Sequence, residues 1–177
     1  RGLGDVYKRQ ILISEILEIP LAIYSTFVIE EKYGFNKTTK QTFVTDIVKN
    51  LLISSVISCL IYAVVIGIIE NLGNNWWVYA FGAVFFIQLI IFFLYPVLIM
   101  PLFNKFEPLD DEEYKKPVEK LLEKINFKAK GLFVMNASLR SSHGNAFFTG
   151  FGKNKRIVFY DTLLETITPD EMEAILG

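Results

Sequence analysis

The chain has 177 residues, a formal net charge of −1 and a hydrophobic content of 52%. This charge gives no basic field for nucleic acid, so no nucleic-acid partner is expected. The apolar residues are concentrated: Glu70 is the only charged residue between Asn50 and Asn104, whereas charges of both signs are frequent from Lys105 onward. This asymmetry predicts a membrane part followed by a soluble part.

The first ten residues, RGLGDVYKRQ, are polar and run directly into an apolar stretch. We interpret residues 1–10 as a non-native leader and leave them out of the fold assignment; an ordinary cytoplasmic leader is the alternative. Residues 11–29 are apolar but contain Glu15, Glu18 and Pro20. They are interpreted as the end of an earlier helix whose carboxylates face other helices or water.

Two longer apolar runs follow. Residues 51–69, as a helix, would be about 28 Å long, close to the hydrocarbon thickness of a bilayer. Residues 76–99 begin with Trp76, Trp77 and Tyr79, whose rings suit the headgroup boundary. A pair of buried core helices is the alternative, but uncharged runs of this length are rare in soluble folds. Residues 11–104 are therefore expected to form a membrane domain.

The loops predict how the chain is oriented in the membrane. The turn between the two apolar runs, ENLGNN, has no basic residue, whereas both flanking segments have several. By the positive-inside rule the turn lies outside, and residues 30–49 and the soluble part lie in the cytoplasm. The chain is thus expected to be an integral, multi-pass membrane protein in contact with lipid. The flanking basic residues are Lys32, Lys37, Lys40, Lys49, Lys105, Lys115 and Lys116.

Residues 105–177 read as alternating short elements. Pro96 and Pro101 lie near the end of the second apolar run and predict a kink or a helix stop there. Residues 110–126 have the pattern of an amphipathic helix with an acidic start. Residues 131–136, 145–150 and 155–161 read as strands, and GFGKN between the last two has the composition of a hairpin turn. The helix is expected to bury Val118, Leu121, Leu122 and Ile125, and the strands Phe147, Phe148, Val158 and Phe159.

A last helix is predicted from TPDEMEAILG. Thr168 is the expected N-cap, Pro169 the first helical residue, and Glu171 the third residue after the cap, which together form a capping box. An apolar stripe then begins with Met172, Ile175 and Leu176. Because a helix with so clear a start is expected to continue, we interpret the chain as a fragment cut at Gly177.

Four segments carry a resemblance to the CAAX prenyl protease 1 family, which are integral-membrane zinc metallopeptidases of the gluzincin type. They are IPLAIYSTFVIEEKYGFNKTT, YPVLIMPLFNKFEPL, NASLRSSHGNAFFTGFGKNKRIVFYDTLL and TPDEMEAIL. The resemblance implies a mainly α membrane protein. Its transmembrane helices would precede a cytoplasmic α+β gluzincin-like domain with a small antiparallel sheet, of which residues 105–177 are the N-terminal part.

The resemblance also implies where the chemistry lies. In the family the last helix leads into H-E-x-x-H, whose two histidines and a later Glu bind zinc. This motif is expected just after Gly177, so we expect neither a catalytic residue nor a metal site within the chain. Zinc would belong to the intact protein only, and the fragment alone would be inactive. His143, the only histidine, makes no zinc site by itself.

The resemblance places the NAFF strand at a sheet edge beside the zinc helix, where an extended peptide can pair with it. The expected substrate-binding residues are Asn145, Ala146, Phe147 and Phe148, although Asn145 could equally cap a turn. Arg140, Ser142 and His143 are expected to shape the mouth of the cleft, and an ordinary loop role is the alternative for His143. Glu30 and Glu31 could line a membrane chamber or belong to a charged loop.

The expected function of the intact protein is cleavage near the C-terminus of prenylated, CAAX-type, or other membrane-presented proteins, by zinc-bound water with a Glu as general base. A heat-shock-type membrane protease of the same zinc clan is an alternative, although the EEKYGFN segment argues against it. A non-catalytic membrane scaffold that has lost the zinc is an alternative of a different class.

Overall fold

The computed structural model describes residues 17–127, 129–150 and 155–176. Residues 1–10 and the expected GFGKN turn fall wholly or largely outside the described residues, so their predictions stay untested. Residues 17–24 are helical and continue into a π-helical turn, η1 (Ser25–Glu30). This agrees with the interpretation of residues 11–29 as the end of a helix, as far as that stretch is described.

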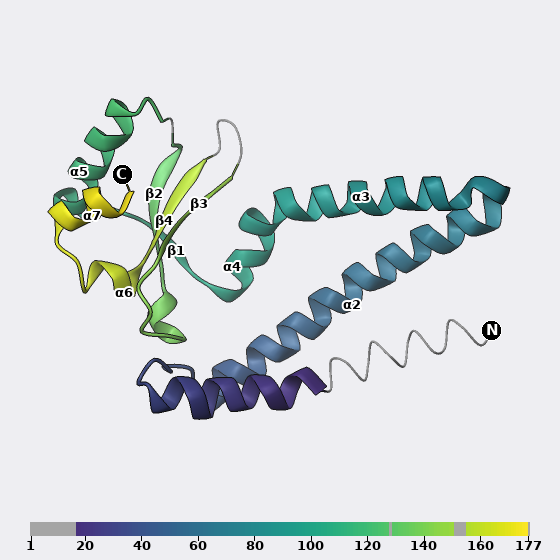
Figure 1. The fold of residues 1–177 in the computed structure, drawn as a ribbon, viewed down its shortest axis with the longest axis horizontal. Helices are drawn as coiled ribbons and strands as arrows, with labels where there is room; N and C mark the ends of the chain where they lie inside the picture. The colour runs from purple at the N-terminus through teal and green to yellow at the C-terminus, as the bar shows by residue number, and fades with distance from the viewer. Residues whose placement is uncertain (1–16, 128, 151–154, 177) are drawn as a thin grey trace.

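The two long helices form a hairpin. α2 (Lys40–Asn71) and α3 (Trp76–Leu94) are joined by the short 3₁₀ turn η2 (Gly73–Asn75), and they diverge from it (Figure 1). Within the described residues, two stretches are long and apolar enough to cross a membrane, Lys40–Asn71 and Gly73–Phe103. Large apolar side chains such as Val56 and Phe81 are 70% and 73% exposed, as expected for surfaces that face lipid or other helices.

α2 begins eleven residues before the predicted run at residue 51, because Thr39 starts it: its hydroxyl oxygen accepts a hydrogen bond from the Thr42 amide (3.1 Å). At the other end of the hairpin, α3 gives way to the π-helical turn η3 (Tyr95–Ile99) and then to the short α4 (Met100–Phe103). Pro96 lies at the start of η3, which matches the predicted distortion near the prolines.

A four-stranded sheet follows the hairpin. Its strands are β1 (Phe106–Pro108), β2 (Gly131–Met135), β3 (Ala146–Thr149) and β4 (Arg156–Tyr160), in the order β1-β2-β4-β3. The three predicted strands are present within one residue at each end, and the short β1 was not predicted. β3 lies at one edge, as expected for the NAFF strand.

The sheet is mixed, so the expectation of an antiparallel sheet was wrong for its central pair. β1 and β3 are antiparallel to their neighbours, whereas β2 and β4 are parallel. The physical reason is the connection: the chain leaves β2, crosses to the sheet edge to form β3, and returns as β4 into the space between them. This crossover makes residues 136–145 the segment that sets where the edge strand lies.

The main core lies between the sheet and two helices, α5 (Glu112–Lys124) and α7 (Pro169–Leu176), which cover one face (Figure 1). A smaller cluster on the other face contains Met135 and Val158 and touches Met100 of α4. A short helix, α6 (Asp161–Leu164), follows β4 directly. The residues fully buried in the main core include Val118, Ile157, Phe159 and Met172.

The predicted apolar face of α5 is confirmed for Val118, Leu121 and Leu122 but is wrong for Ile125, which is 55% exposed. The helix ends at Lys124, and Asn126 takes a positive φ of 53°. Ile125 therefore lies beyond the last helical turn, where the i, i+3, i+4 pattern no longer decides which way a side chain points.

Candidate functional site

The connection between β2 and the edge strand, residues 136–145, is held by polar contacts in its first half. The Lys105 amide donates to the side-chain oxygen of Asn136 (2.7 Å). The amide and the hydroxyl of Ser138 both donate to the carboxylate of Asp161, at the start of α6. These contacts fix the first half of the connection to the end of α4 and to α6.

Arg140 lies in the middle of this connection and binds the membrane part. Its Nε and Nη2 donate to the two carboxylate oxygens of Asp46 in α2, at 2.7 and 3.0 Å. Nη1 donates to Asn104 Oδ1 (3.0 Å), and Nη2 also donates to the carbonyl oxygen of Phe103 (2.7 Å). The side chains of Arg140 and Asp46 are only 26% and 20% exposed, so this two-pronged pair is partly shielded from water.

The loop between η1 and α2 lies along the same connection. The carbonyl oxygen of Arg140 accepts hydrogen bonds from the Lys37 amide (3.0 Å) and the Thr38 hydroxyl (2.9 Å). Ser141 forms an isolated antiparallel bridge with Asn36, and the Ser142 amide donates to the Phe35 carbonyl (3.0 Å). We call residues 34–38 the strap. The strap and the Arg140 side chain together join the membrane part to the sheet.

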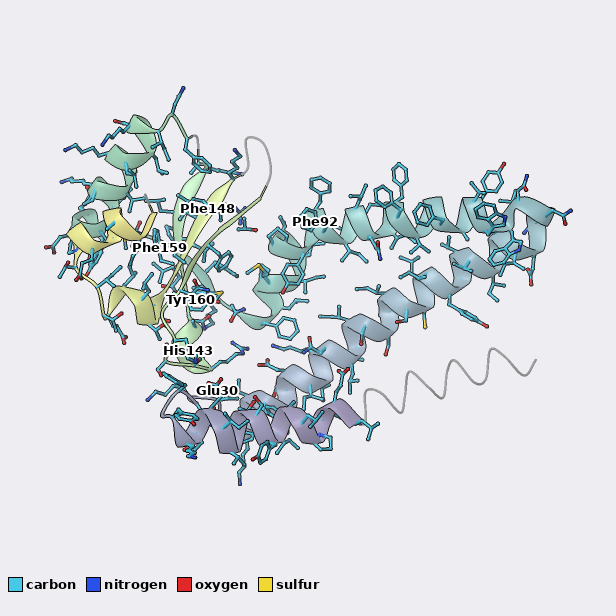
Figure 2. The ribbon with its side chains drawn as sticks, viewed as in Figure 1. Glu30, Phe92, His143, Phe148, Phe159 and Tyr160 are labelled. Atoms are coloured by element: carbon cyan, nitrogen blue, oxygen red, sulfur yellow. The ribbon has the colours of Figure 1, made fainter. Side chains whose placement is uncertain are left out.

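His143 also faces the membrane part, where it lies near Glu30. Its ring stacks on Phe35 (centroids 4.1 Å apart), and its Nε2 lies 3.5 Å from a carboxylate oxygen of Glu30 (Figure 2). Both side chains are partly exposed, at 51% and 38%. Glu31 instead accepts a hydrogen bond from the side-chain amide of Asn36 (2.7 Å), so it braces the strap.

Asn145 occupies the corner before β3. Its side-chain oxygen accepts a hydrogen bond from the Ala146 amide (2.9 Å), which is the turn-capping role that was one of its two expected roles. Its carbonyl oxygen accepts a hydrogen bond from the Tyr160 amide (2.9 Å). Because hydrogen bonding alternates along an antiparallel pair, Phe147 directs its main chain towards β4, and Ala146 and Phe148 direct theirs towards the free edge.

The expected burial of the strand aromatics is confirmed for Val158 and Phe159 but is wrong for Phe148, which is 56% exposed. Phe147 is partly buried and packs edge-on against Tyr160 (centroids 6.1 Å apart). Phe148 lies on an edge strand that α5 and α7 do not fully cover, and it meets only Phe127 edge-on (5.5 Å) among the ring pairs of the described residues. An exposed aromatic side chain at an open edge is available to a ligand.

A cavity of about 550 Å³ lies where the edge strand faces the membrane hairpin. Phe148 and Thr149 of β3 form one wall, and α3 and η3 form the other (Figure 2). The lining is mostly apolar, with few polar groups, as is usual in ligand pockets. The residues of the second wall are Gln88, Ile91, Phe92, Tyr95 and Pro96.

The zinc implied by the family does not fit the described residues. Across residues 17–127, 129–150 and 155–176, no three His, Cys, Asp or Glu side chains come together as a metal site would require. His143 has one carboxylate near it, that of Glu30, and is partly exposed. We therefore assign no catalytic step to these residues.

The start of α7 at Pro169 matches its prediction, and the Thr168–Glu171 contact supplies one of the two hydrogen bonds of the expected capping box. The amide and the hydroxyl of Thr168 both donate to Glu171 Oε2, at 2.8 and 3.0 Å. These hydrogen bonds lower the pKa of the Glu171 carboxyl below its usual value of 4.5. Met172 is fully buried against the sheet, whereas Ile175 is 50% exposed, so only part of the expected apolar stripe reaches the core of the described structure.

Sequence reasoning missed Asp46, Asn104 and the strap as partners of the Arg140 segment. A signal was present: Asp46 is the only acidic residue between Glu31 and Glu70, and an arginine in a packed connection needs an acceptor. Nothing in the spacing, however, selects a partner 94 positions away in the chain.

Comparisons with known proteins agree with this architecture. Residues 10–105 match the family model "CAAX prenyl protease N-terminal, five membrane helices", and residues 108–177 match "Peptidase family M48". The crystal structure of S. mikatae Ste24p superposes with a TM-score of 0.85 at 40% identity, and the match covers 94% of this chain and 40% of that chain.

These matches define a membrane-helix domain followed by a peptidase domain. The chain belongs to the CAAX prenyl protease 1 family, within peptidase family M48. It is 46% identical to the probable CAAX prenyl protease 1 of Schizosaccharomyces pombe, over 94% of this chain and 35% of that protein. It is 39% identical to the CAAX prenyl protease 1 homolog of Homo sapiens, over 87% of this chain and 32% of that protein. The chain thus spans about a third of the length of these relatives.

Proposed function

We propose that this chain is part of a multi-pass membrane zinc endopeptidase that cleaves near the C-terminus of prenylated or otherwise membrane-presented proteins. The observation that carries the proposal is the position of β3: a sheet edge with an unpaired side among the described strands, facing the apolar membrane hairpin across a cavity. The names of the relatives, CAAX prenyl proteases, support a lipid-modified substrate.

In this proposal an extended substrate peptide pairs with the main chain of Phe148 and with the carbonyl of Ala146, which face the free edge, while the Ala146 amide donates to Asn145. Asn145 holds the start of the strand, and Phe147 supports it from the side of the smaller core cluster. Arg140, Ser142 and His143 form the wall that connects this edge to the membrane part. The proposed division is residues 1–10 as leader, 11–104 as membrane domain and 105–177 as the N-terminal part of the peptidase domain.

We further propose that the sheet and residues 30–49 lie on the cytoplasmic side and that the membrane helices contact lipid. The distribution of basic residues around the α2–α3 turn supports this orientation. We also propose that zinc belongs to the intact protein and that the 177-residue chain by itself is inactive, because its sequence has one histidine and no H-E-x-x-H motif.

The test is peptide cleavage by the full-length protein in lipid vesicles, with a farnesylated CAAX peptide as substrate. Phe148→Pro removes a main-chain donor that faces the free edge and is expected to reduce turnover strongly, whereas Phe148→Tyr keeps both the donor and the ring and is the matched control. Equal turnover of both variants, at normal folded yield, would move substrate binding away from β3.

The same assay separates the alternatives. Cleavage of unmodified, damaged membrane proteins in preference to the farnesylated peptide would favour the heat-shock-type protease. A full-length protein that binds no zinc and cleaves neither substrate would favour the non-catalytic scaffold. Dependence of farnesylated-peptide cleavage on zinc, lost with a chelator and restored by added zinc, supports the proposed function.

A further inference from the structure

We infer that Arg140 and Asp46 form a positioning pair that sets how far the peptide-binding edge stands from the membrane helices. The inference rests on the proposed function, because it concerns how a membrane-held substrate reaches β3. Arg140 touches no proposed substrate atom. It acts through the five-residue path from its own position to Asn145, at the start of the edge strand.

The hydrogen bonds of Arg140 fix its orientation relative to both α2 and α4. The guanidinium fork meets both oxygens of Asp46 and simultaneously reaches Asn104 and the carbonyl of Phe103, so it contacts α2 and the end of α4 together. A planar five-donor group holds such an arrangement, whereas the single ammonium of a lysine supplies one charge without the fixed fork. Partial burial of both side chains limits screening by salt.

Hydrogen bonds hold the path from Arg140 to the edge at Arg140, Ser142, His143 and Asn145. The carbonyl of Arg140 is bound by Lys37 and Thr38, and Ser142 is bound by the Phe35 carbonyl. The carbonyl of His143 accepts a hydrogen bond from the hydroxyl of Thr162 (2.8 Å), a buried residue of α6. Because these hydrogen bonds restrict the segment, a movement of Arg140 relative to α2 also moves Asn145 and β3.

This arrangement has a consequence for substrates of different kinds. A peptide whose lipid lies among the membrane helices while its chain pairs with β3 is held at two points, and the distance between those points must match its own length. A peptide without a lipid is held only at the edge. Loosening the Arg140–Asp46 pair therefore weakens binding of the lipidated peptide more than binding of the same peptide without lipid.

The experiment uses the full-length protein in vesicles with two variants, Arg140→Lys and Asp46→Asn. Glu112→Gln is the matched control, because it removes an exposed ion pair with Lys116 (3.5 Å) that lies within α5 and joins no two parts. KM and kcat are measured on a farnesylated peptide and on the identical unmodified peptide. In both variants we expect KM for the farnesylated peptide to rise about tenfold, the effect of roughly 1.4 kcal/mol, with little change for the unmodified one.

A second readout needs no activity. Spin labels are placed at Lys40→Cys, at the start of α2, and Lys120→Cys, in α5, both exposed, in a Cys59→Ser background. The inter-label distance distribution is expected to be narrow in the wild type and in Glu112→Gln, and broader or shifted in Arg140→Lys and Asp46→Asn.

The outcomes separate this inference from the proposed function. A wild-type protein that cleaves neither peptide contradicts the proposed function, while the spin-label distances still test the pair. Equal losses on both peptides with an unchanged distance distribution show a general structural role and overturn the inference alone. If neither variant folds, the wild type alone is decisive. A broad spin-label distance distribution in the wild type, where the Arg140–Asp46 pair is intact, would also overturn the inference.

Discussion

At the scale of single residues, the polar side chains between β2 and β3 bind neighbouring parts of the protein. Arg140 is bound by Asp46 and Asn104, Ser138 by Asp161, and Asn145 by the amide that follows it. The ring of His143 in the same segment stacks on Phe35 and lies near Glu30. The segment therefore forms the wall beside the edge strand.

Gly144 in this segment allows a close approach that a side chain would block. A Cβ added there would lie 3.1 Å from Cδ1 and 3.3 Å from Cα of Leu163, a buried residue of α6. Gly144→Ala is expected to lower the free energy of unfolding by about 1–3 kcal/mol, because the crowded backbone must shift. Thermal unfolding of the purified protein measures it, with Lys120→Ala on the exposed face of α5 as control. A melting temperature equal to that of the control contradicts the prediction.

The Thr168–Glu171 contact predicts a pH dependence. Because hydrogen bonds from Thr168 lower the pKa of Glu171 in the folded state, its stabilising effect is fully present above the usual value of 4.5 and is lost as the pH falls through the lower folded value. Glu171→Gln keeps an acceptor oxygen but not the charge. The variant is expected to be less stable than the wild type near neutral pH, and the difference should shrink below pH 4.5. A difference that grows on acidification would contradict this, as measured by melting temperature across the pH range.

At the scale of elements, strand and helix positions follow the sequence, but their ends decide which side chains are buried. Ile125 fits the stripe of α5 by spacing and yet lies past the end of the helix. Phe148 fits the alternation of β3 and yet lies at an uncovered edge. In both cases the element was predicted correctly. The end of α5 exposes Ile125, and the missing neighbour of β3 among the described strands exposes Phe148.

The difference in burial between Leu122 and Ile125 in the α5 segment predicts a difference in stability between their alanine variants. Leu122 is packed in the main core and is 8% exposed, whereas Ile125 is 55% exposed. Leu122→Ala is expected to cost about 2–5 kcal/mol of stability through lost burial and a residual cavity. Ile125→Ala should cost about 0.5 kcal/mol, as for other surface positions. Chemical or thermal unfolding of the two variants provides the comparison, and similar losses in both would show that Ile125 is covered in the intact protein.

At the scale of the whole molecule, the membrane part and a small mixed sheet meet through apolar packing around Met100 and through a set of polar contacts. The strap, residues 34–38, and the Arg140 side chain supply many of them. Such a junction places β3, the edge strand proposed to bind substrate, next to the membrane helices.

The proposed orientation predicts accessibility to reagents. In the Cys59→Ser background, Asn74→Cys in the turn between α2 and α3 should react with an impermeant thiol reagent added outside intact cells, and Lys120→Cys in α5 should not. Lys120→Cys should react once the membrane is permeabilised. External labelling of Lys120→Cys without permeabilisation would reverse the assigned topology.

The sequence by itself determined the class of the protein. Uncharged runs of bilayer length predict α2 and α3, capping residues predict the start of α7, and alternation predicts three strands, because these are local properties of consecutive residues. The family followed from the same segments, and the matches over residues 10–105 and 108–177 confirm it.

Only the tertiary structure decided how these elements meet. The parallel pairing of β2 with β4, the partnership of Arg140 with Asp46 and the stacking of His143 on Phe35 join residues far apart in the chain. Each depends on where the crossover between β2 and β3 passes, and no local spacing encodes that path. The sequence therefore specified the elements themselves, and long-range packing specified that β3 lies at an edge of the sheet.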